Sequence, residues 1–126
     1  MRITLSRGVT LLLLVAVCLP GVATRAEGEF KETLRFENKN DTKKIELHVP
    51  ASARLMSVQV KSSLRAGAIN WTLRDASGNE RLRGEGRGKG RYIGSTGNID
   101  AIPGVWTLEV GFEDATGSYD IVWMTG

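Results

Sequence analysis

The segment Gly84-Glu85-Gly86-Arg87-Gly88-Lys89-Gly90-Arg91 has the residue types of an anion-binding loop. Glycines leave backbone N–H groups accessible, and arginine and lysine supply positive charge. The glycine spacing matches neither the Walker A pattern nor Gly-x-Gly-x-x-Gly. The segment therefore predicts either a flexible hairpin tip at a sheet edge, which we favour, or a site for sulfate, phosphate or an acidic glycan. The candidate ligand-binding residues are Arg83, Arg87, Lys89 and Arg91.

Residues suited to catalysis are scarce. His48 is the only histidine, and period-2 alternation places it with Lys44 and Glu46 on an outward strand face. No Gly-x-Ser-x-Gly motif is present to position a serine nucleophile. One cysteine, Cys18, excludes an intrachain disulfide and a cysteine-built metal site. We therefore predict a protein that is not an enzyme, with no catalytic residue, no metal and no cofactor.

Two other patterns each allow a binding role. Asp114 and Asp120, with loop carbonyls, supply oxygen ligands of the kind calcium prefers, although their spacing matches no EF-hand loop. A polar hairpin loop over residues 113–117 is the favoured interpretation of that stretch. Trp71, Trp106 and Trp123 could stack on a sugar, but all three fall in the apolar register of their strands. That register favours packing in the core.

The N-terminus has the pattern of a secretory signal peptide over residues 1–26. Arg2 and Arg7 precede an apolar run over residues 9–19, and small residues follow Pro20. Eleven apolar residues are too few for a membrane-spanning helix. Cleavage could follow Ala23 or Ala26. Cys18 lies inside the apolar run and follows Val17, which argues against a lipoprotein, so we predict an exported protein, periplasmic or extracellular.

Removal of residues 1–26 would change the net charge of the protein. Residues 1–26 contain three of the seventeen bases and none of the fourteen acids, so the chain from residue 27 has a net charge of zero. Nucleic-acid binding is therefore not expected. Residues 54–91 contain nine bases and three acids, whereas residues 92–126 contain five acids and no base. This asymmetry predicts that the two segments pair across a sheet, or alternatively that they form a functional dipole.

Apolar residues alternate with polar ones along most of residues 27–126, which is typical of half-buried strands. The clearest runs lie at 44–49, 56–60, 69–74, 106–112 and 119–123, with weaker ones at 33–36 and 91–93. Turn residues separate these runs at 38–41, 49–52, 75–79, 84–90, 102–104 and 114–117. The pattern predicts one all-β domain, a small antiparallel β-sandwich of seven or eight strands.

Two blocks carry a family resemblance. Residues 67–78 resemble the strand and Asp-x-x-Gly turn of bacterial secreted β-sandwich domains, and residues 102–110 with 116–123 resemble their final hairpin. Pre-peptidase C-terminal-type domains have a similar ending, as do uncharacterised envelope proteins. The resemblance implies a jelly-roll-like sandwich without enzymatic activity.

These observations lead to a prediction of function. We expect an exported, non-enzymatic binding or interaction module whose ligand the sequence does not identify, with segment 81–91 and the exposed strand edges as its contact surfaces. The partner classes expected are another envelope or extracellular protein, or an acidic glycan. Binding of a carbohydrate or an acidic polymer through segment 81–91 is the alternative. No stable membrane span is expected after signal cleavage.

Overall fold

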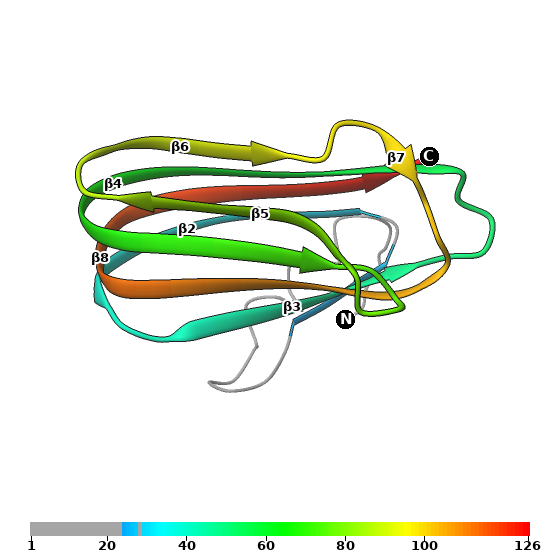
Figure 1. Cartoon of the computed structure of the whole chain (residues 1–126), viewed down its shortest axis with the longest axis horizontal. Helices are drawn as coiled ribbons and strands as arrows, with labels where there is room; N and C mark the ends of the chain where they lie inside the picture. Colours follow the sequence, from blue (N-terminus) through cyan, green and yellow to red (C-terminus); the bar gives the residue numbers. More distant parts are fainter. Residues whose placement is uncertain (1–23, 28) are drawn as a thin grey trace, which may run out of the picture.

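The computed structural model describes residues 24–27 and 29–126, and most of them lie in β-strands (Figure 1). The prediction of an all-β sandwich is confirmed. The strands are β1 (Thr24–Glu27), β2 (Glu29–Lys39), β3 (Thr42–Val49), β4 (Leu55–Arg74), β5 (Glu80–Arg87), β6 (Gly90–Ser95), β7 (Ile99–Asp100) and β8 (Gly104–Thr125).

One continuous hydrogen-bonded sheet folds over to make two packed layers. Layer A contains β2, residues 115–125 of β8, residues 55–64 of β4, and β6 with β7. Layer B contains β1, β3, residues 104–113 of β8, residues 66–74 of β4, and β5. Neighbouring strands are antiparallel except β1, which pairs with β3 in parallel. The acidic segment therefore pairs with the basic one along β4 and β8, as predicted, and Lys61 lies opposite Asp120.

The core is built from the alternating apolar positions of both layers. In layer B, Ile69, Trp71 and Leu73 are buried, and in layer A, Tyr119, Ile121 and Trp123 are buried. Phe36 of layer A packs edge-on against Phe112 of layer B at 4.9 Å between ring centroids. Every strand register predicted from the strongest alternation is confirmed, because one face of each strand must leave water.

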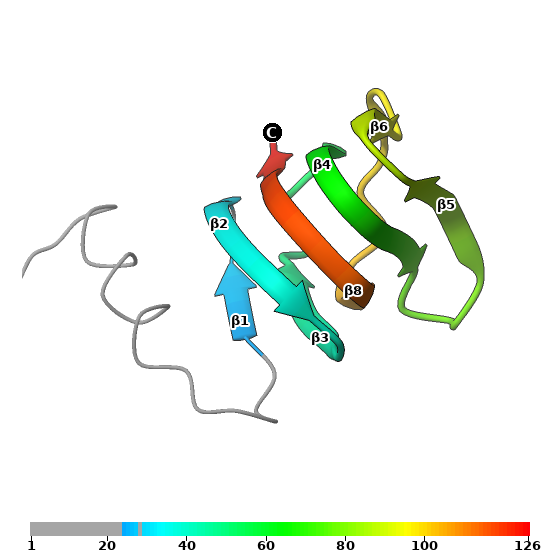
Figure 2. The ribbon, with the colours of Figure 1, turned by 90° about the vertical axis from the view of Figure 1, so that its left-hand side faces the viewer.

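The chain passes from one layer to the other at one end of the sandwich (left in Figure 1). These crossings lie near residues 40, 67, 88 and 114. Figure 2 looks onto this end and shows β2, β8 and β4 side by side. Gly67 and Asp114 have positive φ values of 83° and 45° there. Asn40 donates to Asp114 Oδ1 at 2.8 Å and accepts from its N–H at 2.8 Å.

This arrangement corrects two predictions. Residues 113–117 are not a hairpin loop, because β8 continues through them and bends from layer B into layer A. The predicted final hairpin is therefore one bent strand, β8, over Gly104–Thr125. Residues 84–90 are not a flexible hairpin tip either, because only Gly88 and Lys89 separate β5 from β6, and each of these strands pairs with β4. Gly84 and Gly86 face the core instead, where they lie against the rings of Trp71 and Tyr92.

A polar cluster joins the layers beside the aromatic core. Glu32 of layer A accepts hydrogen bonds from the Tyr119 hydroxyl at 2.6 Å and from Lys43 Nζ of layer B at 2.8 Å. Burial raises the pKa of Tyr119, and the Glu32 carboxylate raises it further, so the hydroxyl remains a donor. The cluster provides hydrogen-bond donors to the buried carboxylate of Glu32, which the strand register directs into the interior.

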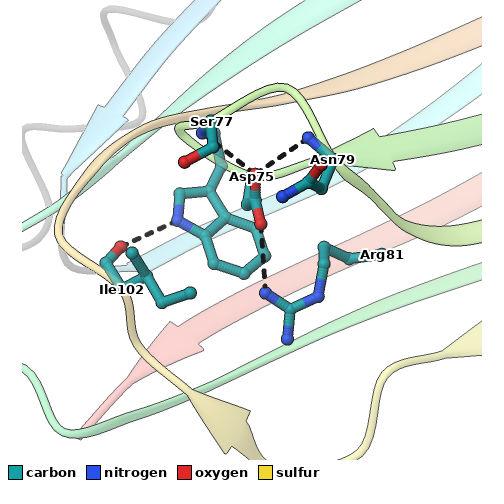
Figure 3. A network of polar contacts seen from close by, with 6 residues as sticks. Asp75, Ser77, Asn79, Arg81 and Ile102 are labelled. Atoms are coloured by element: carbon teal, nitrogen blue, oxygen red, sulfur yellow. Dashed lines mark hydrogen bonds and ion pairs between the residues drawn. The ribbon is translucent and has the colours of Figure 1, made fainter.

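The turn after β4 lies at the opposite end of the sandwich and contains a network of polar contacts (Figure 3). Asp75 Oδ1 accepts hydrogen bonds from the N–H groups of Ser77 and Asn79, both at 2.9 Å, and its Oδ2 pairs with Arg81 at 3.3 Å. The Arg81 guanidinium lies 5.2 Å from the Trp106 ring centroid, a cation–π distance. The Asp-x-x-Gly turn predicted here is thus part of a network that reaches the core.

The predicted signal peptide lies outside the described residues except for 24–26, which belong to β1. Its cleavage, and the fate of Cys18, stay predictions. In the part of the chain that the structure describes, no helix has the length and hydropathy needed to cross a membrane.

Candidate functional site

The outer face of layer A contains a row of polar side chains along each strand. The strand register sets Arg35 of β2, Ser118 of β8, Ser63 of β4 and Arg91 of β6 in one row across the layer. Two residues further along each strand, the next row contains Thr33, Asp120, Lys61 and Ile93. Side chains in such rows lie on one face and contact their cross-strand neighbours.

A hollow of about 600 Å³ lies over the first row, near the bends of β4 and β8. Its centre is formed by small residues, because serine, threonine and glycine leave space between the longer side chains around them. Arginines stand on both sides of this space, Arg35 on β2 and Arg65 on β4, and Glu37 is the one carboxylate among the lining residues. The lining residues are Arg35, Phe36, Glu37, Ser63, Arg65, Thr116, Gly117 and Ser118.

A second hollow of about 270 Å³ follows the first along the same three strands. It lies over β8 between Lys31 and Thr33 of β2 and Gln59 and Lys61 of β4. Asp120 is on its floor and accepts a hydrogen bond from the Thr33 hydroxyl at 2.5 Å. We call the two hollows together the trough; its floor is β8, and β2 and β4 form its walls.

The cations around the trough have no ion-pair partner among the residues that the structure describes. Six other basic side chains do form ion pairs, on other parts of the surface. Cations without a carboxylate partner are free to bind an anionic ligand through charge-assisted hydrogen bonds. The unpaired cations of this face are Lys31, Arg35, Lys61, Arg65 and Arg91.

The four cations proposed from sequence are not brought together. Arg83 and Arg87 lie on the outer face of layer B, where they pair with Glu80 and Glu113, each at 2.9 Å. Lys89 is in the turn between β5 and β6. Arg91 lies on the outer face of layer A, beside Ser63. The turn between β5 and β6 separates these residues onto opposite faces, because β5 and β6 belong to different layers.

The remaining candidates have structural surroundings. Trp71, Trp106 and Trp123 retain at most 2% of their surface, so the prediction that they pack in the core is confirmed. His48 lies on the outer face of layer B, half-buried, 3.6 Å from Glu46. Asp114 and Asp120 have separate partners, Asn40 and Thr33. The described residues contain no cluster of three or more histidine, cysteine or acidic side chains around a common point.

Sequence reasoning missed most of the trough. The four cations form no contiguous basic motif in the sequence. Three residues separate Lys31 from Arg35, and three separate Lys61 from Arg65. One signal was available, since the spacing of four residues in each pair keeps both cations on the same face of a strand. The pairing of β2 with β8 and β4 that sets the two pairs opposite each other is not visible in the sequence.

Comparison with solved structures identifies the fold. A pre-peptidase C-terminal domain of a collagenase from Bacillus anthracis superposes with a TM-score of 0.56 at 19% identity, covering 84% of this chain and 98% of that domain. The CBM36-1 domain of a multidomain xylanase from the hindgut metagenome of Trinervitermes trinervoides gives 0.47 at 11% identity, covering 75% of this chain and 96% of that one. No family model matches the chain, and no curated protein does. The resemblance to pre-peptidase C-terminal domains is thus confirmed for the fold.

Proposed function

We propose that this protein is an exported, non-catalytic binding module that holds an acidic glycan in the trough of layer A. The observation that carries the proposal is the set of four unpaired cations, Lys31, Arg35, Lys61 and Arg65, that stand around hydroxyl groups on the floor and walls of the trough. Arginine binds carboxylate and sulfate groups through paired hydrogen bonds, and serine and threonine exchange hydrogen bonds with sugar hydroxyls.

The composition of the trough supports binding without catalysis. Its hydroxyl groups, on Ser63, Thr116 and Ser118, have no histidine beside them, because the only histidine of the chain lies on layer B. A serine or threonine nucleophile requires an adjacent general base. The arrangement is suited to positioning a ligand, which arginine and hydroxyl groups do without a chemical step.

A glycan fits this face better than a nucleic acid does. Single-stranded nucleic acids depend on aromatic side chains on which their bases stack. The three tryptophans are buried, and the one aromatic residue that lines the trough, Phe36, retains only 9% of its surface. Hydroxyl-rich surroundings with flanking cations instead match a ligand that carries both hydroxyl and acidic groups.

The proposal is tested with three polymers that share one backbone: dextran, carboxymethyl-dextran and dextran sulfate. We expect the protein lacking residues 1–23, which retains β1, to bind the two acidic polymers in a salt-sensitive manner and not to bind dextran, as measured by calorimetry. The double variant Arg35→Ala/Arg65→Ala should lose binding. The matched control Arg83→Ala/Arg87→Ala removes two arginines from layer B and should bind normally.

Two results would contradict this assignment. Equal binding of all three polymers, or of none, would remove the acidic glycan as ligand. Loss of binding in Arg83→Ala/Arg87→Ala, with Arg35→Ala/Arg65→Ala unaffected, would move the site to segment 81–91, the place the sequence alone suggested.

A further inference from the structure

We infer that the ligand of the trough is a single extended polyanionic chain that runs parallel to β8 and occupies both hollows at once. This inference rests on the proposed function and specifies the shape and the length of the ligand. The two hollows share β2, β8 and β4 and follow each other from Thr116 to Val122 along β8. Six residues of extended strand correspond to about 20 Å.

The placement of the cations defines this direction. Lys31 and Arg35 stand on the β2 wall, and Lys61 and Arg65 stand on the β4 wall. Within each pair the residues are four apart, or about 13 Å along the strand. Each hollow therefore has one cation on either side, arginines in the hollow near the bends and lysines in the other. A lone sulfate or phosphate bound in one hollow leaves the two cations of the other hollow unused.

The two ends of the trough differ in chemistry. The arginine hollow has serine, threonine and glycine at its centre, so that an acidic group can enter between two guanidinium groups that bind it in a bidentate manner. The lysine hollow has Asp120 on its floor and Gln59 and Thr33 beside it. Asp120 repels an anion placed directly above it, so this hollow binds sugar hydroxyls, and the acidic groups there point outward to Lys31 and Lys61.

The ligand class that follows is a linear glycan with acidic groups on successive or alternate sugars. Binding to both hollows requires several sugar units, because a single unit fills one hollow only. Affinity should therefore increase with chain length until the chain spans the trough, and then level off.

The experiment measures the affinity of galacturonic acid, its dimer and longer oligomers by calorimetry. The proteins compared are the unmodified chain, Arg35→Ala/Arg65→Ala, Lys31→Ala/Lys61→Ala, and the control Arg83→Ala/Arg87→Ala. Circular dichroism establishes that each variant is folded. We expect long oligomers to bind about tenfold more weakly, or worse, to either trough variant, as expected for lost hydrogen bonds to charged groups. The dimer should be weakened by the arginine variant and unaffected by the lysine variant.

The outcomes separate this inference from the proposal beneath it. Affinity that does not change with length, or long oligomers that bind normally to Lys31→Ala/Lys61→Ala, would overturn the extended chain while leaving an acidic site in the arginine hollow. Failure of every oligomer and of both acidic dextrans to bind the unmodified protein would overturn the proposed function itself.

Discussion

Single residues determine how the rings of the core fit between the layers. Gly84 of β5 and Gly94 of β6 face the Trp71 indole from opposite layers, and Gly86 lies against the Tyr92 ring. A Cβ atom at any of these positions would overlap a ring. Gly84, Gly86 and Gly94 thus have a packing function, which explains why a segment so rich in glycine forms two strands and not a flexible loop.

Gly84→Ala is expected to destabilise the fold, because the new methyl group overlaps the Trp71 ring. Overpacking of this kind costs about 1–3 kcal/mol. The free energy of unfolding in urea is the measurement. Gly88→Asn is the matched control, since Gly88 has a φ of 81° and open space around it, and asparagine tolerates that conformation at about 1 kcal/mol or less. Equal stability of Gly84→Ala and the unmodified protein would refute this role.

Asp75 makes stability depend on pH at the acid end. Burial raises the pKa of Asp75, but hydrogen bonds from the N–H groups of Asn79 and Ser77 and the charge of Arg81 outweigh it, leaving the pKa below its ordinary value. A carboxylate with a lower pKa in the folded state stabilises that state above the unfolded pKa, about 3.9. The stabilisation disappears as the pH falls through the folded pKa.

Asp75→Asn should therefore lower the melting temperature at pH 7 and flatten its decline between about pH 5 and pH 2. Thermal unfolding followed by circular dichroism across this range is the measurement. The control is Asp100→Asn, because Asp100 is exposed and its carboxylate accepts no hydrogen bond from the residues that the structure describes. A parallel decline in Asp75→Asn and the unmodified protein would show that another carboxylate controls acid unfolding.

At the scale of elements, the bends of β4 and β8 decide the architecture. Gly67 in β4 faces the backbone carbonyl of Asp114 in β8, and Gly88 N–H donates to the Gly67 carbonyl at 2.8 Å. These contacts let two adjacent strands turn together from one layer into the other. The turn residues at 114–117 correctly predict that the chain changes direction there. The same residue types occur where a strand bends into another layer and where a hairpin turns back, so they do not distinguish these two structures.

Gly67→Ala should disrupt this bend. The substitution combines a positive φ of 83° with a methyl group that overlaps backbone atoms, which cannot rotate away as a side chain can. Together these effects cost about 2–5 kcal/mol. Gly97→Ala, with a φ of 66° and open surroundings, isolates the cost of the backbone conformation, about 1–2 kcal/mol. Urea midpoints compare the two; similar values would mean that the contact with Asp114 is unimportant.

At the scale of the whole molecule, two kinds of contact join the layers: the apolar core and the Glu32–Lys43–Tyr119 cluster. The Glu32 side chain is 8% exposed and that of Lys43 is 24% exposed. Removing one partner of such a pair leaves a charge in poorly solvated surroundings, which costs more than the pair contributes.

Lys43→Met should therefore cost about 2–4 kcal/mol, below the largest values known because Lys43 is partly exposed. Glu32→Gln/Lys43→Met should recover more than half of that loss, since it removes both charges. Chemical denaturation of the single and double variants forms the test. If the double variant is as unstable as Lys43→Met, the lysine acts through packing and not through its charge.

The sequence by itself determined which face of each strongly alternating strand is buried, because alternation along a strand is a local property that needs no knowledge of the partner strand. The buried faces of the strongest strands and the three core tryptophans follow from it, and the Asp75 turn follows from its turn residues. Only the tertiary structure decided which cations share a surface. Thr33 and Asp120 are neighbours although they are 87 residues apart, and Arg87 and Arg91 lie on opposite layers although they are four apart. Strand pairing brings distant residues together and separates near ones, so the trough could be located only after the pairing was known.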